Sequence, residues 1–463
     1  MDRQGAVSRA WNYVDKGGFF EDLARRVAIP TESQNPERET EIRNYLCQEM
    51  GPYLETMGFQ WKILENKALP RLPFLVAQRM ENPSRPTVLT YGHGDTVRGM
   101  EGKWTKNRSP WRLLQDGQKL YGRGTADNKG QHTINLAAMG CVLEERGHLG
   151  FNLKVLLETA EEIGSPGLHR FCMDHRDLLA ADVLIASDGP RLKPTRATVY
   201  GGSRGVFNFD LEVNLRQGAH HSGNWGGLLS NPGIILAHAI ASMVNPRGKI
   251  LVQELVPKDI PEWVRQSLAC LDVEGEEGPP VDPDWGEPGL SLAEKVYGWS
   301  SLEVLAFQTG DPSAPAHAIP PRAWARCHLR FVAGQDPSSF LPAIRRHLDS
   351  HGFQQVHVEP VRESWTNATR MSPKEPWVMR TMSSLQKTSG QQPDFLPNLG
   401  GTLPNDAFTE ILGLPTVWIP HSYGACSQHA PDEHLLLPLA RDAMGLMAGL
   451  FWDLGEEAWE VGL

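Results

Sequence analysis

Apolar residues recur along the chain in two patterns, which together predict alternating strands and helices. Short uninterrupted apolar runs indicate buried strands at residues 87–90, 153–157 and 183–186. Apolar positions at helical spacing indicate helices over residues 36–58 and 128–145. We therefore expect a mixed α/β sheet between helices, and ligands of such sheets gather beyond the carboxyl ends of the strands.

From Thr198 the pattern changes. Apolar and polar residues alternate from Phe207 to Val213, which is typical of a half-exposed strand. A helix, a strand and a second helix are expected after it, over residues 232–244, 325–332 and 341–351. These elements predict an inserted α+β unit over residues 199–365.

Strand character returns at residues 415–419, and a last helix is expected over 437–452. The first domain would therefore consist of residues 1–198 and 366–463, interrupted by the insertion. The acidic segment 272–288 is rich in Gly and Pro, so we expect an irregular surface loop there.

Length and composition narrow the classes of protein. At 463 residues the chain is long enough for two domains, and its 40% hydrophobic and 22% charged residues are ordinary for a folded soluble protein. The net charge of −10 disfavours nucleic acid as a partner, and no apolar run has the length of a membrane span. Six scattered cysteines and the mixed polarity that follows Met1 favour a cytosolic protein with reduced thiols.

Acidic and histidine residues follow the predicted strands. Each position has a simple explanation when taken alone: His93 could be held by a turn aspartate, and Asp127 could cap a helix. Adjacent carboxylates at a strand end are costly unless a cation or an acid-base role uses them. Five such motifs at strand ends are an improbable coincidence: His93-Gly94-Asp95, Gly122 to Gly130, Glu158 to Ser165, Ser187-Asp188-Gly189 and His429 to Glu433.

In this order the motifs resemble those of the dinuclear zinc amidohydrolase family, which includes carboxypeptidase G, aminoacylase, succinyl-diaminopimelate desuccinylase and the carnosinase-type dipeptidases. The resemblance covers nearly the whole chain. The segment His220-His221-Ser222-Gly223-Asn224-Trp225-Gly226-Gly227 is similar to the lid histidine motif of the dipeptidase branch. The resemblance implies a catalytic domain with an inserted lid and dimerisation domain.

The resemblance also implies a ligand set. One metal ion would be held by His93, Asp127 and Asp188, and a second by Asp127, Glu162 and His429. His, Asp and Glu ligands without thiolate suit zinc, with manganese or cobalt as alternatives. The paired ions would activate water, with Glu161 as general base, while Asp95 would orient His93.

Other residues resemble substrate contacts of the family. His221 would reach the active site of the other subunit in a homodimer and stabilise the oxyanion, with His220 as its adjacent rival. Arg330 resembles a lid arginine that clamps a substrate carboxylate, and Thr402 stands where the dipeptidase branch has a serine. His317 is either a further substrate contact or a surface residue.

The expected function is hydrolysis of an amide bond in a small carboxylate-bearing substrate, a dipeptide by preference. A deacylase of N-acyl amino acids shares the same metals, base and clamp, so it stays an alternative. Gly201-Gly202-Ser203-Arg204-Gly205 matches a serine hydrolase motif, but that motif needs a helix after the serine, and a strand is expected here. A non-catalytic relative is disfavoured because every expected ligand is present.

Overall fold

A computed structural model describes residues 2–271, 273, 280–361 and 365–456. Its largest element is an eight-stranded mixed sheet with the order β1-β2-β6-β3-β7-β17-β9-β16, in which β1 spans Gln60–Leu64 and β2 spans Phe74–Arg79. The four central strands run parallel, so their carboxyl ends meet at one edge of the sheet. They are β6 (Asn152–Glu158), β3 (Thr87–His93), β7 (Val183–Ala186) and β17 (Thr416–Trp418), and they confirm the four strands expected in this part.

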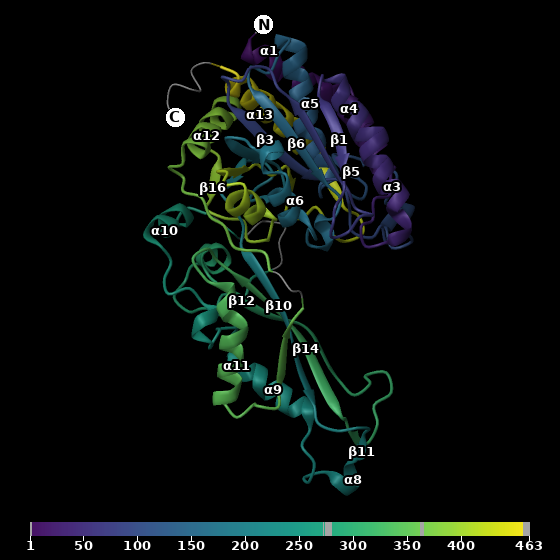
Figure 1. Ribbon diagram of the computed structural model, residues 1–463, viewed down its shortest axis with the longest axis vertical. Helices are drawn as coiled ribbons and strands as arrows, with labels where there is room; N and C mark the ends of the chain where they lie inside the picture. The colour runs from purple at the N-terminus through teal and green to yellow at the C-terminus, as the bar shows by residue number, and fades with distance from the viewer. Residues whose placement is uncertain (1, 272, 274–279, 362–364, 457–463) are drawn as a thin grey trace.

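Helices cover both faces of the large sheet (Figure 1). Alternate residues of each central strand enter different apolar clusters, as Val88 and Leu89 do. The expected helices near 128–145 and 437–452 are α5 (Lys129–Arg146) and α13 (Leu437–Leu454), and both pack in the same cluster as Val88. That cluster also contains three helices without a sequence prediction, α1 (Arg3–Asp15), α2 (Gly18–Val27) and α12 (Pro376–Ser389).

The segment expected as one helix over residues 36–58 is helical but not uniform. It consists of η1 (Pro36–Arg38), α3 (Glu39–Asn44), the π-helical η2 (Tyr45–Met50) and α4 (Gly51–Thr56). Pro52 has no N–H to donate to the carbonyl of Gln48, and the N–H of Gly51 instead reaches the carbonyl of Leu46. The wider turn follows from this proline.

A separate four-stranded antiparallel sheet has the order β12-β14-β10-β15. Its strands are β10 (Gly205–Asn214), β12 (Ser301–Thr309), β14 (Arg322–Phe331) and β15 (His357–Pro360). The alternation over 207–213 is confirmed, because every second residue of β10 packs against α9 (Pro232–Met243) and α11 (Phe340–Ser350). Edge strand β12 was not predicted.

The chain leaves the large sheet after β9 (Thr198–Tyr200) and returns to it at β16 (Asp394–Leu396). In Figure 1 the four-stranded sheet extends away from the large sheet, and β11 (His220–His221) and α8 (Ser222–Trp225) lie at its far tip. The segment 272–288, expected as a loop, lies partly outside the described residues; residues 280–288 contain no helix or strand. None of the described helices is long and apolar enough to cross a membrane.

Candidate metal centre

The expected metal ligands converge at the carboxyl edge of the parallel strands. His93 is the last residue of β3, and Asp188 follows β7. Glu162 lies in η4 (Glu161–Ile163), four residues after the end of β6, and Asp127 lies just before α5. His429 comes from the loop between β18 (Ser422–Tyr423) and β19 (His434–Leu436), so the ends of four strands and the start of one helix position the cluster.

The cluster consists of two groups that share one residue. His93, Asp127 and Asp188 form the first group, and Asp127, Glu162 and His429 form the second. Nε2 of His93 lies 3.0 Å from Oδ1 of Asp127, and Nε2 of His429 lies 2.9 Å from Oδ2 of the same carboxylate. Asp127 therefore presents one oxygen to each group, which is the geometry of a bridging carboxylate.

Burial gives this cluster unusual electrostatics. Burial, with the nearby charge of Asp127, raises the pKa of Glu162 to about 7 and that of Asp188 to about 6. Burial also raises the pKa of Glu161 well above its usual range. Carboxylates this close repel one another in a low dielectric, so the site favours bound cations.

The donor set fits divalent metal ions. Each group offers imidazole nitrogen and carboxylate oxygen, with no thiolate, which suits zinc and also manganese or cobalt. The imidazole of His93 is fully buried, and the carboxylate of Asp127 is only 7% exposed. Such a set of deprotonated ligands would bind an ion tightly enough to offset the repulsion between them.

Asp95 holds two parts of the cluster together. Nδ1 of His93 lies 3.1 Å from the carbonyl oxygen of Asp95 and 3.5 Å from its carboxylate. The same carboxylate accepts the backbone N–H groups of Glu161 and Glu162 at 3.2 and 3.1 Å. Asp95 thus contacts the ring expected to bind metal and the turn expected to carry the general base.

Glu433 is a positioning residue without a role in the sequence prediction. Its buried carboxylate accepts Nη1 of Arg123 at 2.7 Å and the N–H groups of Gly124, Ala126 and Asp127 at 2.9–3.1 Å. These bonds fix the loop that delivers Asp127, whose peptide bond to Asn128 is cis. The only sequence signal was an acidic residue close after His429. Gln428 also contacts Asp127, donating to Oδ2 at 2.5 Å.

A cleft of about 870 Å³ opens over the cluster. Asp127, Glu161, Asp188 and His429 line one part of it, and Arg330 and Thr402 line another. Nη1 of Arg330 donates to Oγ1 of Thr402 at 2.9 Å. The structure thus brings the two expected carboxylate-binding residues into contact, in the same cleft as the metal ligands.

The histidines of the tip lie apart from this cleft. His221 and His317 are exposed near the tip of the four-stranded sheet, where Ser222 N–H donates to the carbonyl of His317 at 2.9 Å. The ring of His220 packs edge-on against Trp225. None of these three histidines lines the cleft of its own chain as described.

Ser203, the residue of the serine hydrolase motif, is buried and forms an isolated parallel β-bridge with Leu399. Its hydroxyl donates to the carbonyl of Leu403 at 3.2 Å, and strand β10 follows instead of a helix. Gly202 is required for packing, since a Cβ atom there would come within 2.5 Å of the carbonyl oxygen of Thr369. The glycines around Ser203 therefore serve close packing.

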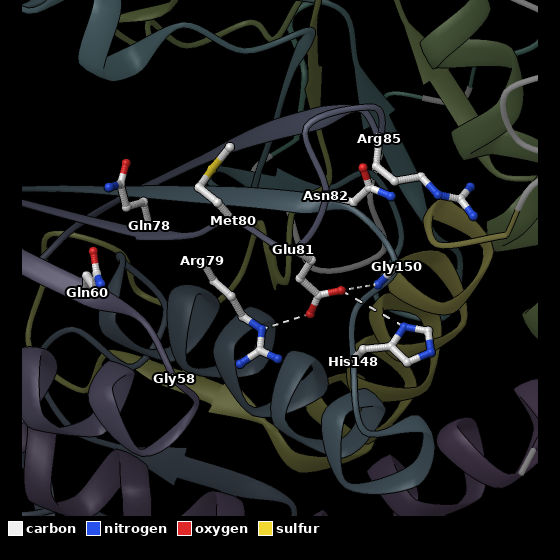
Figure 2. Close-up of a pocket in the computed structure, with 10 residues that line it drawn as sticks. All are labelled: Gly58, Gln60, Gln78, Arg79, Met80, Glu81, Asn82, Arg85, His148 and Gly150. Carbon is white, nitrogen blue, oxygen red and sulfur yellow. Dashed lines mark hydrogen bonds and ion pairs between the residues drawn. The ribbon is translucent and has the colours of Figure 1, made fainter.

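A second depression, of about 700 Å³, lies at the amino-terminal edge of the parallel strands (Figure 2). Glu81 lies at its centre. The Glu81 carboxylate accepts hydrogen bonds from Arg79 at 2.9 Å and from the backbone N–H groups of Leu149 and Gly150 at 2.8 and 2.7 Å. These local hydrogen bonds account for the polar centre of the depression, so the cleft over the His93 and His429 groups is the candidate site.

Comparison with known proteins places the chain among peptidases. The sequence model of peptidase family M20/M25/M40 matches residues 89–453. The chain is 26% identical to the mouse Beta-Ala-His dipeptidase, over 98% of this chain and 96% of that protein. It is 31% identical to a Cys-Gly metallodipeptidase of Candida albicans, over 91% of each chain.

Two solved structures share the fold. A dipeptidase from Saccharomyces cerevisiae superposes with a TM-score of 0.81 and 21% identity, covering 99% of this chain and all of that one. Human carnosine dipeptidase superposes with a TM-score of 0.77 and 22% identity, covering 97% and 99% of the two chains. The fold expected from the sequence is therefore confirmed.

Proposed function

Because the chain belongs to peptidase family M20/M25/M40, we propose that it is a dipeptidase that binds two zinc ions and cleaves dipeptides with a free carboxylate. The observation that supports this most strongly is the composition of one cleft. A cluster built to hold cations lines one part, and the Arg330–Thr402 pair lines another. A dipeptide offers a scissile carbonyl to the first and a carboxylate to the second.

His93, Asp127 and Asp188 would hold one ion, and Asp127, Glu162 and His429 the other. When bound, the ions supply the Lewis acidity that activates water and polarises the scissile carbonyl. Glu161 stands beside the ligands, with Oε2 3.9 Å from Nε2 of His93, and belongs to neither group. Its carboxylate takes the proton of the attacking water and returns it to the leaving amine.

Arg330 orients the substrate through two features of the guanidinium. Its planar fork can bind both oxygens of a carboxylate, and it stays charged at neutral pH. Nη1 already contacts Thr402, which leaves the other N–H groups for the substrate. Holding the carboxylate at a fixed place sets the scissile bond over Glu161 and keeps longer peptides out.

We further propose that residues 199–365 form a lid and dimerisation domain and that His221 acts in the partner subunit. His221 is exposed at the tip, away from its own cleft. Edge strand β12 exposes apolar side chains, with Leu305 59% and Phe307 44% exposed, and Ile234 of α9 is 60% exposed. An apolar edge strand of this kind is a surface for pairing with a second copy.

The lid proposal also applies to the exposed His317, which lies beside the His221 segment. We propose that His317 contacts the substrate in the same active site of the partner subunit. We propose the cytosol as the location, which the six free cysteines support.

The substrate class can be tested with a matched set of compounds. β-Alanyl-histidine and cysteinyl-glycine, the dipeptides named in the relatives, are compared with their C-terminal amides and with N-acetyl amino acids. We expect cleavage of the free dipeptides and a fall in kcat/KM of roughly 100-fold for the amides, since the amide leaves the half-buried Arg330 without a counter-charge. Preference for the N-acetyl compounds would replace dipeptidase by deacylase.

A further inference from the structure

Arg204 joins the two sheets at the point where the chain passes from one to the other. It directly precedes β10, and its Nη1 lies 3.5 Å from Oγ of Ser301, the first residue of β12. The side chain is nearly buried, with the residue 8% exposed. Burying a charged guanidinium costs free energy unless hydrogen bonds or an opposite charge compensate for it.

Four hydrogen bonds connect Arg204 to four consecutive residues of the opposite segment. Its backbone N–H donates to the carbonyls of Leu399 and Gly401, both at 3.1 Å. Its Nε donates to the carbonyl of Gly400 at 2.7 Å, and its own carbonyl accepts the hydroxyl of Thr402 at 2.9 Å. Arg204 therefore fixes the whole turn from Leu399 to Thr402.

That turn carries the proposed carboxylate contact. Gly400, Gly401 and Thr402 line the cleft, and the Thr402 hydroxyl oxygen accepts Arg330. Because the hydroxyl hydrogen is directed to Arg204, the oxygen is oriented to accept from Arg330. The turn is also supported from the other side, since a Cβ atom on Gly400 would lie 2.9 Å from Cγ1 of Val296.

Arg204 and Arg330 bring positive charge to this turn. Among the residues that the structure describes, neither forms an ion pair with a carboxylate, but the charge of Glu303 on β12 acts on Arg204. Burial and the charge of Arg330 lower the pKa of Arg204 to about 9, and burial lowers that of Arg330. Arg204 is nearly buried and Arg330 is half-buried, so their positive charge favours an anionic ligand in the cleft beside this turn.

We propose that Arg204 is a positioning residue for the substrate carboxylate: it holds the Leu399–Thr402 turn so that Thr402 and Arg330 form one anion subsite. The inference rests on the proposed dipeptidase function and adds a residue that does not line the cleft. The guanidinium fork matters as well as the charge, because Nε must reach the Gly400 carbonyl while Nη1 faces β12.

The test compares Arg204→Met and Arg204→Lys with Arg326→Met. Arg326 is the matched control, an arginine of the same sheet that is partly exposed and pairs with Asp210 at 2.8 Å. The readouts are KM, kcat, metal content and the ratio of kcat/KM for a dipeptide to that for its C-terminal amide. We expect Arg204→Met to raise KM for the free dipeptide about tenfold and to reduce that ratio, with kcat changed less than threefold and metal content unchanged.

Arg204→Lys should be impaired similarly, since an ammonium keeps the charge but not the fork. It also remains informative if the Met variant does not fold. Unchanged KM and ratio in either variant would overturn the proposal, and so would full recovery in the Lys variant. A wild-type protein that cleaves no dipeptide would instead overturn the proposed function, so the two failures are distinguishable.

Discussion

Oδ1 of Asp95 accepts the backbone N–H of Glu161 at 3.2 Å, which ties the end of β3 to the turn after β6. Asp95 is fully buried, and its other carboxylate oxygen accepts Glu162 N–H. One side chain thereby fixes the backbone of both the proposed base and a proposed metal ligand. The spacing between Glu161 and the metal groups is therefore set by the fold before substrate binds.

The role of Glu161 can be tested by removing only its charge. Glu161→Gln should lower kcat by about 10²- to 10⁴-fold, because Glu161 is the one carboxylate among the described residues lining the cleft that belongs to neither ligand group. Metal content should stay at the wild-type value, as Glu161 is not in either ligand group. Steady-state kinetics and elemental analysis measure both.

Two comparisons complete this test. Glu162→Gln should lose metal as well as activity, since Glu162 belongs to the second group. Glu144→Gln, at an exposed glutamate of α5, should change neither. Wild-type kcat in Glu161→Gln would rule out Glu161 as the general base.

Glu433 should control both stability and metal affinity. Glu433→Gln removes the charge that Arg123 contacts at 2.7 Å, and both side chains are 1% exposed. Leaving the buried guanidinium unpaired should lower the free energy of unfolding by roughly 3–5 kcal/mol. The loop that delivers Asp127 also loses an anchor, so metal affinity should fall about 10- to 100-fold. Denaturant unfolding and competition with a chelator give the two values; Glu144→Gln again serves as control.

The partner role of His221 predicts complementation between two inactive variants. Glu161→Gln and His221→Asn subunits should each be nearly inactive alone. In a mixed dimer one composite site carries both changes and the other carries neither, so random mixing should restore roughly a quarter of wild-type activity. If His221 acted in its own subunit, every site would contain one defect and no activity would return.

The edge strand supplies the control for this experiment. Leu305→Glu with Phe307→Glu should give monomers by sedimentation and abolish the complementation, because two charges would replace exposed apolar contacts of β12. Met379→Glu changes a residue that is 55% exposed on α12, outside the four-stranded sheet, and should leave the dimer intact.

His328 makes a pH-dependent contribution to stability. Burial and the charges of Arg330 and Arg204 lower its pKa to about 4, and its Nδ1 donates to Asn208 at 2.6 Å. The folded state thus binds this proton less readily than the unfolded state does. Stability from this residue is full above the unfolded pKa of about 6.5 and is lost as pH falls toward 4.

Thermal unfolding at about pH 7.5 and about pH 5 tests that statement. His328→Asn keeps a donor but cannot titrate, so its melting temperature should fall less between the two pH values than that of the wild type. Equal losses in both proteins would show that His328 contributes nothing to the acid sensitivity.

The sequence predicted the elements whose pattern is set by burial. The parallel strands are buried and rich in apolar residues because helices cover both faces, and β10 alternates because only one face is covered. Edge strand β12 escaped prediction because its apolar residues stand at four consecutive positions, Val304 to Phe307, so it has no alternation. The π-helical turn escaped as well, since it depends on one proline inside a regular pattern.

The metal ligands could be predicted because they are motif residues at strand ends. The residues that hold the ligands and the substrate-binding turn in position could not be predicted. Glu433 reaches the loop of Asp127 across more than 300 positions of sequence, and Arg204 reaches the Thr402 turn across 198. Such pairs have no local signal; only the fold brings them together. The separation of His221 from its own cleft likewise depends on the tertiary arrangement of the two sheets and has no local sequence signal.

The central claim is that two metal ions in the His93 and His429 groups make this protein a dipeptidase, and metal counting with activity tests it most directly. Purified protein is analysed for metal and assayed on a dipeptide before chelation, after chelation and after zinc return. We predict close to two ions per chain, loss of hydrolysis on chelation and its recovery with zinc. Metal-free protein that cleaves the dipeptide at an undiminished rate would contradict the claim.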